Sequence, residues 1–178
     1  MRKIGFLVPG LILAGMLSIG WAEEPRVEIK EVPESHVVWV RAQTPIQRMG
    51  PTMGRVFGEI FRYLGPKGIQ PTGPPVAVYY SPPDSTTIDL EVCVPVPADV
   101  TGDENVKVKT LPGGRMASLI YVGPYRNIGP SYSALTQWIE KNGYRQTGPP
   151  RQVYLKGPES TSDQREYRTE ILKPISSK

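Results

Sequence analysis

Apolar and polar residues alternate along several short stretches of the chain. The clearest stretch covers residues 88–96, where every second side chain is aliphatic: Ile88, Leu90, Val92 and Val94. Alternation of this kind predicts a β-strand with one buried face. Residues 37–41, 76–80, 116–121, 153–155 and 167–175 are also predicted to be strands.

Two further segments have helical rather than strand periodicity. Their apolar positions are Met49, Met53, Val56 and Ile60 in the first, and Ile128, Tyr132, Leu135 and Ile139 in the second. Both segments contain a Gly-Pro pair near their start, where the missing N–H of proline costs a helix nothing. The pattern predicts two amphipathic helices whose apolar stripes pack on a sheet.

The chain also resembles itself. A shift of 79 residues places Val27-Glu-Ile-Lys on Val106-Lys-Val-Lys, and a shift of 75 places Thr72-Gly-Pro-Pro on Thr147-Gly-Pro-Pro. Elements that stay in phase around a loop of different length indicate a duplicated unit. We therefore predict two βαββ repeats, residues 27–98 and 106–175, with a linker at 97–105.

The predicted fold class is α+β. Two repeats related by a pseudo-twofold would form one antiparallel sheet, with both main helices on one face and a ligand groove on the other. If the more apolar set of each strand faces the helices, the opposite face collects aromatic and acidic side chains: Trp39, Tyr79, Tyr154, Glu91 and Glu170. Aromatic rings around a carboxylate suit a small cationic or amphipathic organic molecule.

Two alternatives remain open for these residues. The aromatic side chains could instead belong to a second small core covered by loops. The glutamates could form salt bridges with Arg41 or Arg168 on neighbouring strands.

The N-terminus has the pattern of a secretory signal. Arg2 and Lys3 precede an apolar run over residues 4–19, and Gly20-Trp-Ala ends in small residues. We expect cleavage after residue 22, a mature domain of residues 23–178, and a periplasmic or secreted location; an uncleaved anchor is the alternative. Half of the formal net charge of +4 comes from this segment, so the mature chain has no nucleic-acid footprint.

The inventory of reactive side chains is small. His36 is the only histidine and Cys93 the only cysteine, so no internal disulfide, nucleophilic triad or cysteine-rich metal site is expected. We predict no metal and no cofactor. Haem binding through His36 is a minor alternative.

Several motifs resemble the GyrI-like small-molecule-binding domain, also called the effector-binding domain and related to the SOUL fold. These motifs are Gly123-Pro-Tyr before a helix, Gly143-Tyr, Val153-Tyr-Leu and Thr169-Glu-Ile-Leu-Lys-Pro-Ile. The resemblance covers residues 27–175 and implies a pair of strand-helix-strand-strand repeats.

The resemblance also implies roles for three residues. Glu170 would be the groove glutamate of the final strand, and Tyr125 would close one end of the groove. Some stand-alone members are described as hydrolases, in which case Glu170 and Tyr154 would form the catalytic pair. Regulatory members carry a DNA-binding segment that is not found here, and docking of a protein partner through the groove is a further alternative.

Overall fold

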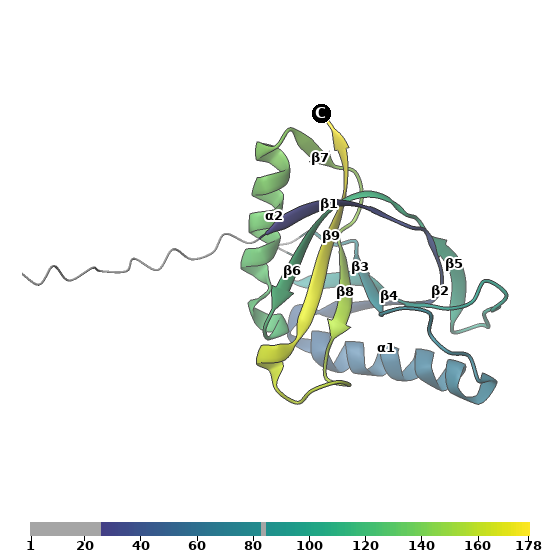
Figure 1. Cartoon of the computed structure of the whole chain (residues 1–178). Helices are drawn as coiled ribbons and strands as arrows, with labels where there is room; N and C mark the ends of the chain where they lie inside the picture. The colour runs from purple at the N-terminus through teal and green to yellow at the C-terminus, as the bar shows by residue number, and fades with distance from the viewer. Residues whose placement is uncertain (1–25, 83–84) are drawn as a thin grey trace, which may run out of the picture.

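The computed structural model describes residues 26–82 and 85–178 (Figure 1). The strands are β1 (Val27–Val32), β2 (Ser35–Pro45), β3 (Val76–Tyr79), β4 (Thr87–Pro95), β5 (Lys107–Leu111), β6 (Gly114–Val122), β7 (Tyr144–Gln146), β8 (Arg151–Lys156) and β9 (Arg168–Ser177). The α-helices are α1 (Met49–Leu64) and α2 (Gly129–Lys141). Short 3₁₀ turns occupy Ile46–Arg48, Gly65–Lys67, Tyr125–Asn127 and Gln164–Glu166.

The strands form one antiparallel sheet in the order β1-β6-β9-β8-β3-β4-β2-β5, with β7 added to the end of β9. This arrangement confirms the predicted α+β class. Three strands were not predicted as separate elements: β1, β5 and β7. Both β1 and β5 are short, so their alternation of apolar and charged residues spans only a few positions.

The first strand of each half of the chain pairs with a strand of the other half. β1 pairs with β6, β5 pairs with β2, and the two halves meet at the centre of the sheet where β3 pairs with β8. Residues 27–95 and 107–177 therefore contain the same succession of two strands, a helix and two strands, apart from β7. An origin of this order by duplication stays a prediction.

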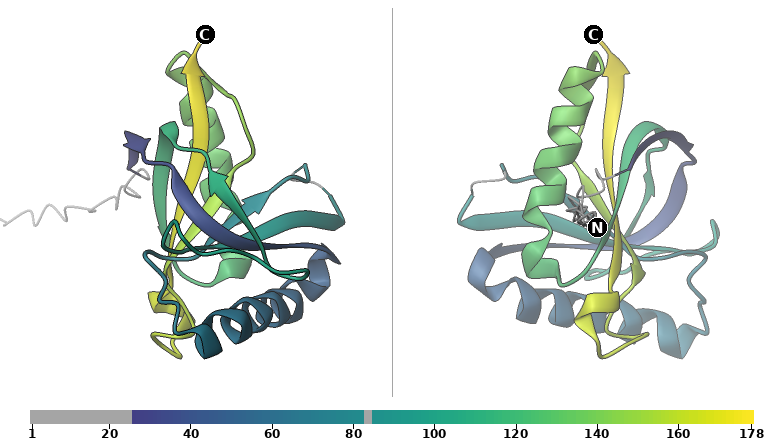
Figure 2. Two further views of the ribbon diagram at one scale, coloured as in Figure 1. Left: turned by 90° about the vertical axis from the view of Figure 1, so that its right-hand side faces the viewer. Right: turned by 60° about the vertical axis from the view of Figure 1, so that its left-hand side comes forward.

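The sheet curls strongly, as Figure 2 shows. The β1–β2 and β5–β6 turns meet where the curl narrows, and a Cβ on Gly113 would lie 2.4 Å from the Val32 carbonyl oxygen and 2.5 Å from the Glu34 nitrogen. Only glycine permits this approach, because real Cβ atoms do not come so close to backbone atoms. The contact holds the two hairpin turns against each other.

Both helices cover the outer face of the curled sheet, here called the helix face. Val56 and Ile60 of α1 pack on Val38, Leu90 and Val92, while Leu135 and Ile139 of α2 pack on Leu119 and Ile171 of β6 and β9. The predicted apolar stripes of the two helices are thus confirmed. Figure 2 shows the two helices over different parts of the sheet and running in different directions.

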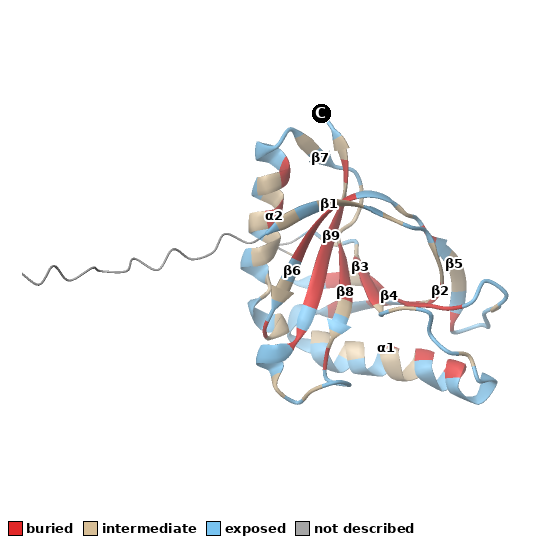
Figure 3. Ribbon diagram, in the orientation of Figure 1, coloured by how far each residue is buried: buried red, intermediate tan, exposed pale blue. Residues whose placement is uncertain are grey.

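The inner face of the curl is a second core. It is filled by aliphatic, sulfur-containing and aromatic side chains: Val37, Val76, Val78, Cys93, Leu111, Met116, Val153 and Leu172, with Val32 and Trp39 beside them. Figure 3 shows that the central strands are buried along most of their length. The predicted ligand groove on this face is therefore wrong. A second core does lie here, as the alternative proposed, but of the three aromatic residues named for it Trp39 alone belongs to it, and the curl of the sheet rather than loops encloses it.

The proposed signal at residues 1–22 lies outside the described residues. Within the described ranges, no helix is long and apolar enough to cross a membrane.

Candidate functional site

Aromatic side chains gather on the helix face between α1 and α2. This interhelical aromatic cluster consists of Phe57, Tyr79, Tyr125, Tyr132, Tyr154 and Tyr167. Its members come from both helices, from β3 and β8, and from the segments that precede α2 and β9. Tyr167 is buried, while the other five rings are partly accessible.

Tyr154 of β8 is the centre of the ring contacts. Its ring meets Phe57 of α1 edge to face at a centroid distance of 6.0 Å and Tyr125 at 5.7 Å. Tyr125 in turn packs on Tyr167 at 5.0 Å. Edge-to-face rings at these distances attract each other through their quadrupoles. The cluster therefore joins α1 to the segment before α2 across the surface of the sheet.

A hydrogen-bond network centred on Gln152 lies among these rings. The hydroxyl groups of Tyr79 and Tyr154 donate to the Gln152 Oε1 atom at 3.1 Å and 3.3 Å. The Gln152 Nε2 atom donates to the Tyr132 hydroxyl oxygen at 3.0 Å. One amide thus connects three tyrosines from β3, β8 and α2, using neutral groups alone.

Burial keeps these hydroxyl groups protonated. It raises the pKa of Tyr79 and Tyr132, and it raises the pKa of Tyr154 well above its usual value. Burial, followed by the nearby Glu159 carboxylate, raises the pKa of Tyr125 to about 12. All four hydroxyl groups are therefore protonated at neutral pH, and those of Tyr79 and Tyr154 could donate to a ligand only by giving up their bonds to Gln152.

Two polar residues of β9 border the cluster. Thr169 pairs with Tyr154 in the sheet and is fully buried, and its hydroxyl has no hydrogen-bond partner among the described residues. Lys173 is only 6% exposed, and its Nζ atom donates to the Thr136 hydroxyl at 2.5 Å and lies 5.7 Å from the centroid of the Tyr132 ring.

The predicted faces of β3 and β8 are wrong. Tyr79 and Tyr154 were assigned to the face opposite the helices, but they pack with α1 on the helix face, whereas Val76, Val78 and Val153 point into the curl. The rule that the more apolar face meets the helices fails because both faces are buried. Here the inner face is the more apolar one on these two strands.

Trp39, Glu91 and Glu170 do lie on the face opposite the helices, as expected, but within the second core. Glu91 is 4% exposed and forms ion pairs with Lys109 and Arg41, while it accepts a hydrogen bond from Tyr80 at 2.6 Å. The salt-bridge alternative thus describes Glu91 correctly, with Arg41 as one of its partners.

Glu170 is 8% exposed, forms an ion pair with Lys30, and accepts a hydrogen bond from Ser118 at 2.5 Å. It pairs with Val153 in the sheet, whereas Tyr154 pairs with Thr169, so Glu170 and Tyr154 point to opposite faces. The predicted catalytic pair of Glu170 and Tyr154 is therefore wrong. Neither of the two glutamates contacts the aromatic cluster.

A carboxylate does approach the cluster at the Tyr125 end. A Cβ added to Gly157 would lie 2.9 Å from the Tyr125 hydroxyl and 2.8 Å from a Glu159 carboxylate oxygen, so the two groups flank the same glycine. Glu159 is exposed and also accepts a hydrogen bond from the Gly157 backbone N–H at 2.9 Å. The cluster thus has a negative group at one end and Lys173 towards the other.

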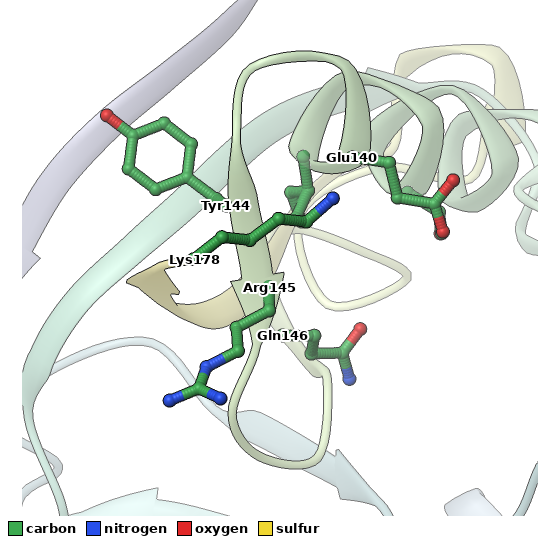
Figure 4. Close-up of a pocket in the computed structure, with 7 residues that line it drawn as sticks. Glu140, Tyr144, Arg145, Gln146 and Lys178 are labelled. Carbon is green, nitrogen blue, oxygen red and sulfur yellow. The ribbon is translucent and has the colours of Figure 1, made fainter.

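A cavity of about 330 Å³ lies between α2 and β7, and Figure 4 shows the residues around it. Its wall includes Thr136 and Glu140 of α2, Arg145 of β7, and Lys178. Thr136 is the residue whose hydroxyl receives the hydrogen bond from Lys173, so the cavity and the buried ammonium group share this side chain.

Metal ligands do not gather in the part of the chain that the structure describes, since no three His, Cys, Asp or Glu side chains cluster there. The Nε2 atom of His36 lies 3.1 Å from the Val100 carbonyl oxygen and so donates to it. This ring nitrogen is therefore engaged by the backbone.

The sequence matches the GyrI-like small molecule binding domain over residues 25–176. The chain belongs to the GyrI-like family. A search of curated protein sequences gives no significant match.

Solved structures show the same fold. The C-terminal domain of EcmrR is 25% identical, with a TM-score of 0.78 over 86% of this chain and 99% of that domain. The full EcmrR chain in its DNA complex is also 25% identical, with a TM-score of 0.79. The match covers 87% of this chain and 59% of the EcmrR chain.

More distant relatives share the fold alone. A hydrolase from Listeria innocua is 17% identical, with a TM-score of 0.64 over 88% of this chain and 94% of that one. The protein SAV2435, bound to tetraphenylphosphonium, is 12% identical, with a TM-score of 0.62 over 85% of this chain and 94% of that one.

Tyr79, Tyr125 and Tyr154 were predicted from the sequence as site residues, but other members of the site were not. Phe57 and Tyr132 were treated as helix core or passed over, and Gln152, Thr169 and Lys173 were not considered. The available signal was a polar residue within a largely apolar strand, which describes Gln152, Thr169 and Lys173.

Proposed function

We propose that this GyrI-like domain binds a small, lipophilic and amphipathic organic molecule in the interhelical aromatic cluster. The observation that carries the proposal is the network of Gln152 and three tyrosine hydroxyl groups between the two helices. An apolar site with a few convergent polar groups is the usual design of a small-molecule pocket. The Thr169 hydroxyl is a further polar group without a partner among the described residues.

The rings supply the binding energy for such a molecule. Phe57, Tyr125 and Tyr154 are partly accessible, and a planar ligand that separates them keeps an aromatic partner on each side. Stacked or edge-to-face rings contribute about 0.5–1.5 kcal/mol per pair beyond their buried area. The tetraphenylphosphonium complex of SAV2435 supports this choice of ligand class, since that ligand is built from phenyl rings.

The cationic ligand expected from the sequence depended on two carboxylates in the predicted groove, those of Glu91 and Glu170. With Glu91 and Glu170 inside the curl, a cation would rely on the tyrosine ring faces and on Glu159 beside Tyr125. An amphipathic ligand, which the sequence also suggested, needs only the rings and the neutral network.

The test is titration calorimetry of the full chain with tetraphenylphosphonium and with a neutral naphthylamine dye. Tyr154→Leu removes the central ring and should weaken binding of either probe by about tenfold or more, which corresponds to about 1.4 kcal/mol. Tyr80→Leu is the matched control, because Tyr80 lies one residue beyond Tyr79 and bonds to Glu91 on the other side of the sheet.

The outcomes separate binding from other roles. Recovery of each probe unchanged supports binding, whereas a converted product would support the hydrolase alternative. If neither probe binds, or if Tyr80→Leu weakens binding as much as Tyr154→Leu, the proposed site is wrong.

We also infer that the domain works outside the cytoplasm. The support is the basic start, the apolar run and the small residues that end at Ala22. N-terminal sequencing of the protein from a periplasmic extract should begin at Glu23. A mature chain that starts at Met1 and stays in the cytoplasm would contradict this inference.

A further inference from the structure

Lys173 has the environment of a ligand-binding group rather than of a structural one. Lys30 and Lys109 both reach into the curl, and each forms an ion pair with a buried glutamate. Lys173 is more deeply buried than either, yet within the described ranges no carboxylate lies within ion-pair distance of its Nζ atom. The Glu140 carboxylate, one helical turn beyond Thr136, acts on the ammonium group at longer range, in the direction that raises the pKa of Lys173.

The ammonium group is also incompletely hydrogen bonded. A lysine has three N–H donors, and among the described residues only the Thr136 hydroxyl accepts one of them. The Tyr132 ring adds a cation–π contact at 5.7 Å. An ammonium buried without a counter-charge is costly to a fold, so an anion that binds beside it would offset part of that cost.

The position of Lys173 links the two features of the helix face. The Tyr132 ring that it contacts is the same ring whose hydroxyl belongs to the Gln152 network. The Thr136 side chain that it contacts forms part of the wall of the α2–β7 cavity, where Arg145 and Lys178 add positive charge and Glu140 adds negative charge (Figure 4). Lys173 therefore lies between the aromatic cluster and the α2–β7 cavity.

We propose that the ligand of this domain carries an anionic head group that Lys173 binds at the α2 side of the cluster, while its aromatic part lies among the tyrosines. This inference rests on the proposed function and fixes the sign of the ligand's charge. It assigns aromatic or lipophilic acids as the preferred class. Two of the three ammonium donors are available for the head group's oxygens.

Tetraphenylborate and tetraphenylphosphonium provide the test, because they have nearly the same shape and opposite charge. Their dissociation constants are measured for the full chain and for Lys173→Met, which keeps the length of the side chain and removes its charge. The ratio of the two constants should shift by about tenfold or more towards the cation in the variant, since a charge pair at close range in a partly buried site exceeds that effect. Comparing ratios cancels the intrinsic difference in hydrophobicity between the two ions.

Lys141→Met is the matched control, since Lys141 ends α2 and is exposed. Its ratio should stay within about twofold of the wild type. If Lys173→Met does not fold, Lys173→Gln keeps a hydrogen-bond donor towards Thr136 and removes the charge, and the same shift is expected.

Each result decides a different question. If neither ion binds the wild-type chain, the proposed function itself fails. If both bind and the ratio is the same in the Lys173 variants, the function stands and the role of Lys173 is overturned. An equal shift in Lys141→Met would also overturn it, because the effect would then come from overall surface charge.

Discussion

The two faces of one curled sheet bury polar groups in different ways. β8 shows both, since Gln152 and Tyr154 point to the helices while Arg151 and Val153 point into the curl. On the helix face the polar groups are mostly neutral hydroxyls and an amide that share hydrogen bonds. On the inner face they are full charges, with Glu91 and Glu170 each paired to a lysine.

This difference separates a site that can exchange partners from one that cannot. Breaking a neutral hydrogen bond and remaking it to a ligand changes the free energy little, because both states satisfy the donor. Breaking a buried ion pair leaves a charge without a partner, which is strongly unfavourable. The helix face is therefore suited to ligand exchange, and the inner face to holding the curl closed.

The largest expected effect comes from breaking an inner-face ion pair. Glu91→Ala leaves the Lys109 ammonium and the Tyr80 hydroxyl without their acceptor, and it should lower the free energy of unfolding by about 3–5 kcal/mol. Urea unfolding measures this change. Glu31→Ala, at an exposed position of β1, should change stability by no more than about 0.5 kcal/mol. A small loss in Glu91→Ala would mean that water enters the curl.

Neighbouring residues of β9 test whether both faces are cores. Ile171 packs under α2 and Leu172 packs inside the curl, and both are buried. Ile171→Ala and Leu172→Ala should each cost about 2–5 kcal/mol, because each leaves a cavity among packed side chains. Urea midpoints of the two variants give the comparison. An inner face open to solvent would make Leu172→Ala much milder than Ile171→Ala.

A smaller effect is expected from the neutral network. Gln152→Leu leaves the hydroxyl groups of Tyr79, Tyr132 and Tyr154 without the shared amide, at a cost of about 1–3 kcal/mol. The variant should also weaken tetraphenylborate binding in calorimetry. Gln137→Leu, at an exposed position of α2, is the control and should leave both properties unchanged. Unaltered stability and binding in Gln152→Leu would show that the network is incidental.

The sequence predicted the elements better than the faces. Periodicity located both helices and the strands that run through the core. In the helices the signal was clear because Val56, Ile60, Leu135 and Ile139 recur at helical spacing on one buried face. It missed β1 and β5, two short strands at the edges of the sheet whose alternation of apolar and charged residues spans only a few positions. The curl itself could not be predicted, since it depends on contacts such as that of Gly113 with the distant β1–β2 turn.

Failure to predict the curl also explains the misplaced site. Once the inner face is buried, strand alternation no longer distinguishes core from groove, and Val76 and Val78 look like helix-facing residues. The tyrosines were singled out from the sequence as unusual, but their partners come from α1, α2 and β9. Phe57, Gln152 and Lys173 are connected only through the rings of Tyr154 and Tyr132, which depends on how the helices lie on the sheet.

The subtlest effect concerns the one lysine on the helix face that lacks a carboxylate partner among the described residues. Burial lowers the pKa of Lys173 below its usual value of 10.5, with Glu140 acting weakly in the opposite direction. Between the folded and unfolded pKa values, the unfolded chain binds more protons than the folded one. Stability should therefore rise with pH across this window, by about 1.4 kcal/mol for each unit of depression.

Urea unfolding at pH 7, 8, 9 and 9.5, at constant ionic strength, measures that slope. Lys173→Met should lose this component of the rise, while Lys141→Met should run parallel to the wild type. The scan stops below pH 10 because the raised pKa values of Tyr79, Tyr132 and Tyr154 act with the opposite sign above it. Parallel curves for wild type and Lys173→Met would mean that Lys173 is as well solvated in the fold as in the unfolded chain. Saturating tetraphenylborate should flatten the wild-type rise, because a bound anion restores the pKa of the ammonium that it pairs with.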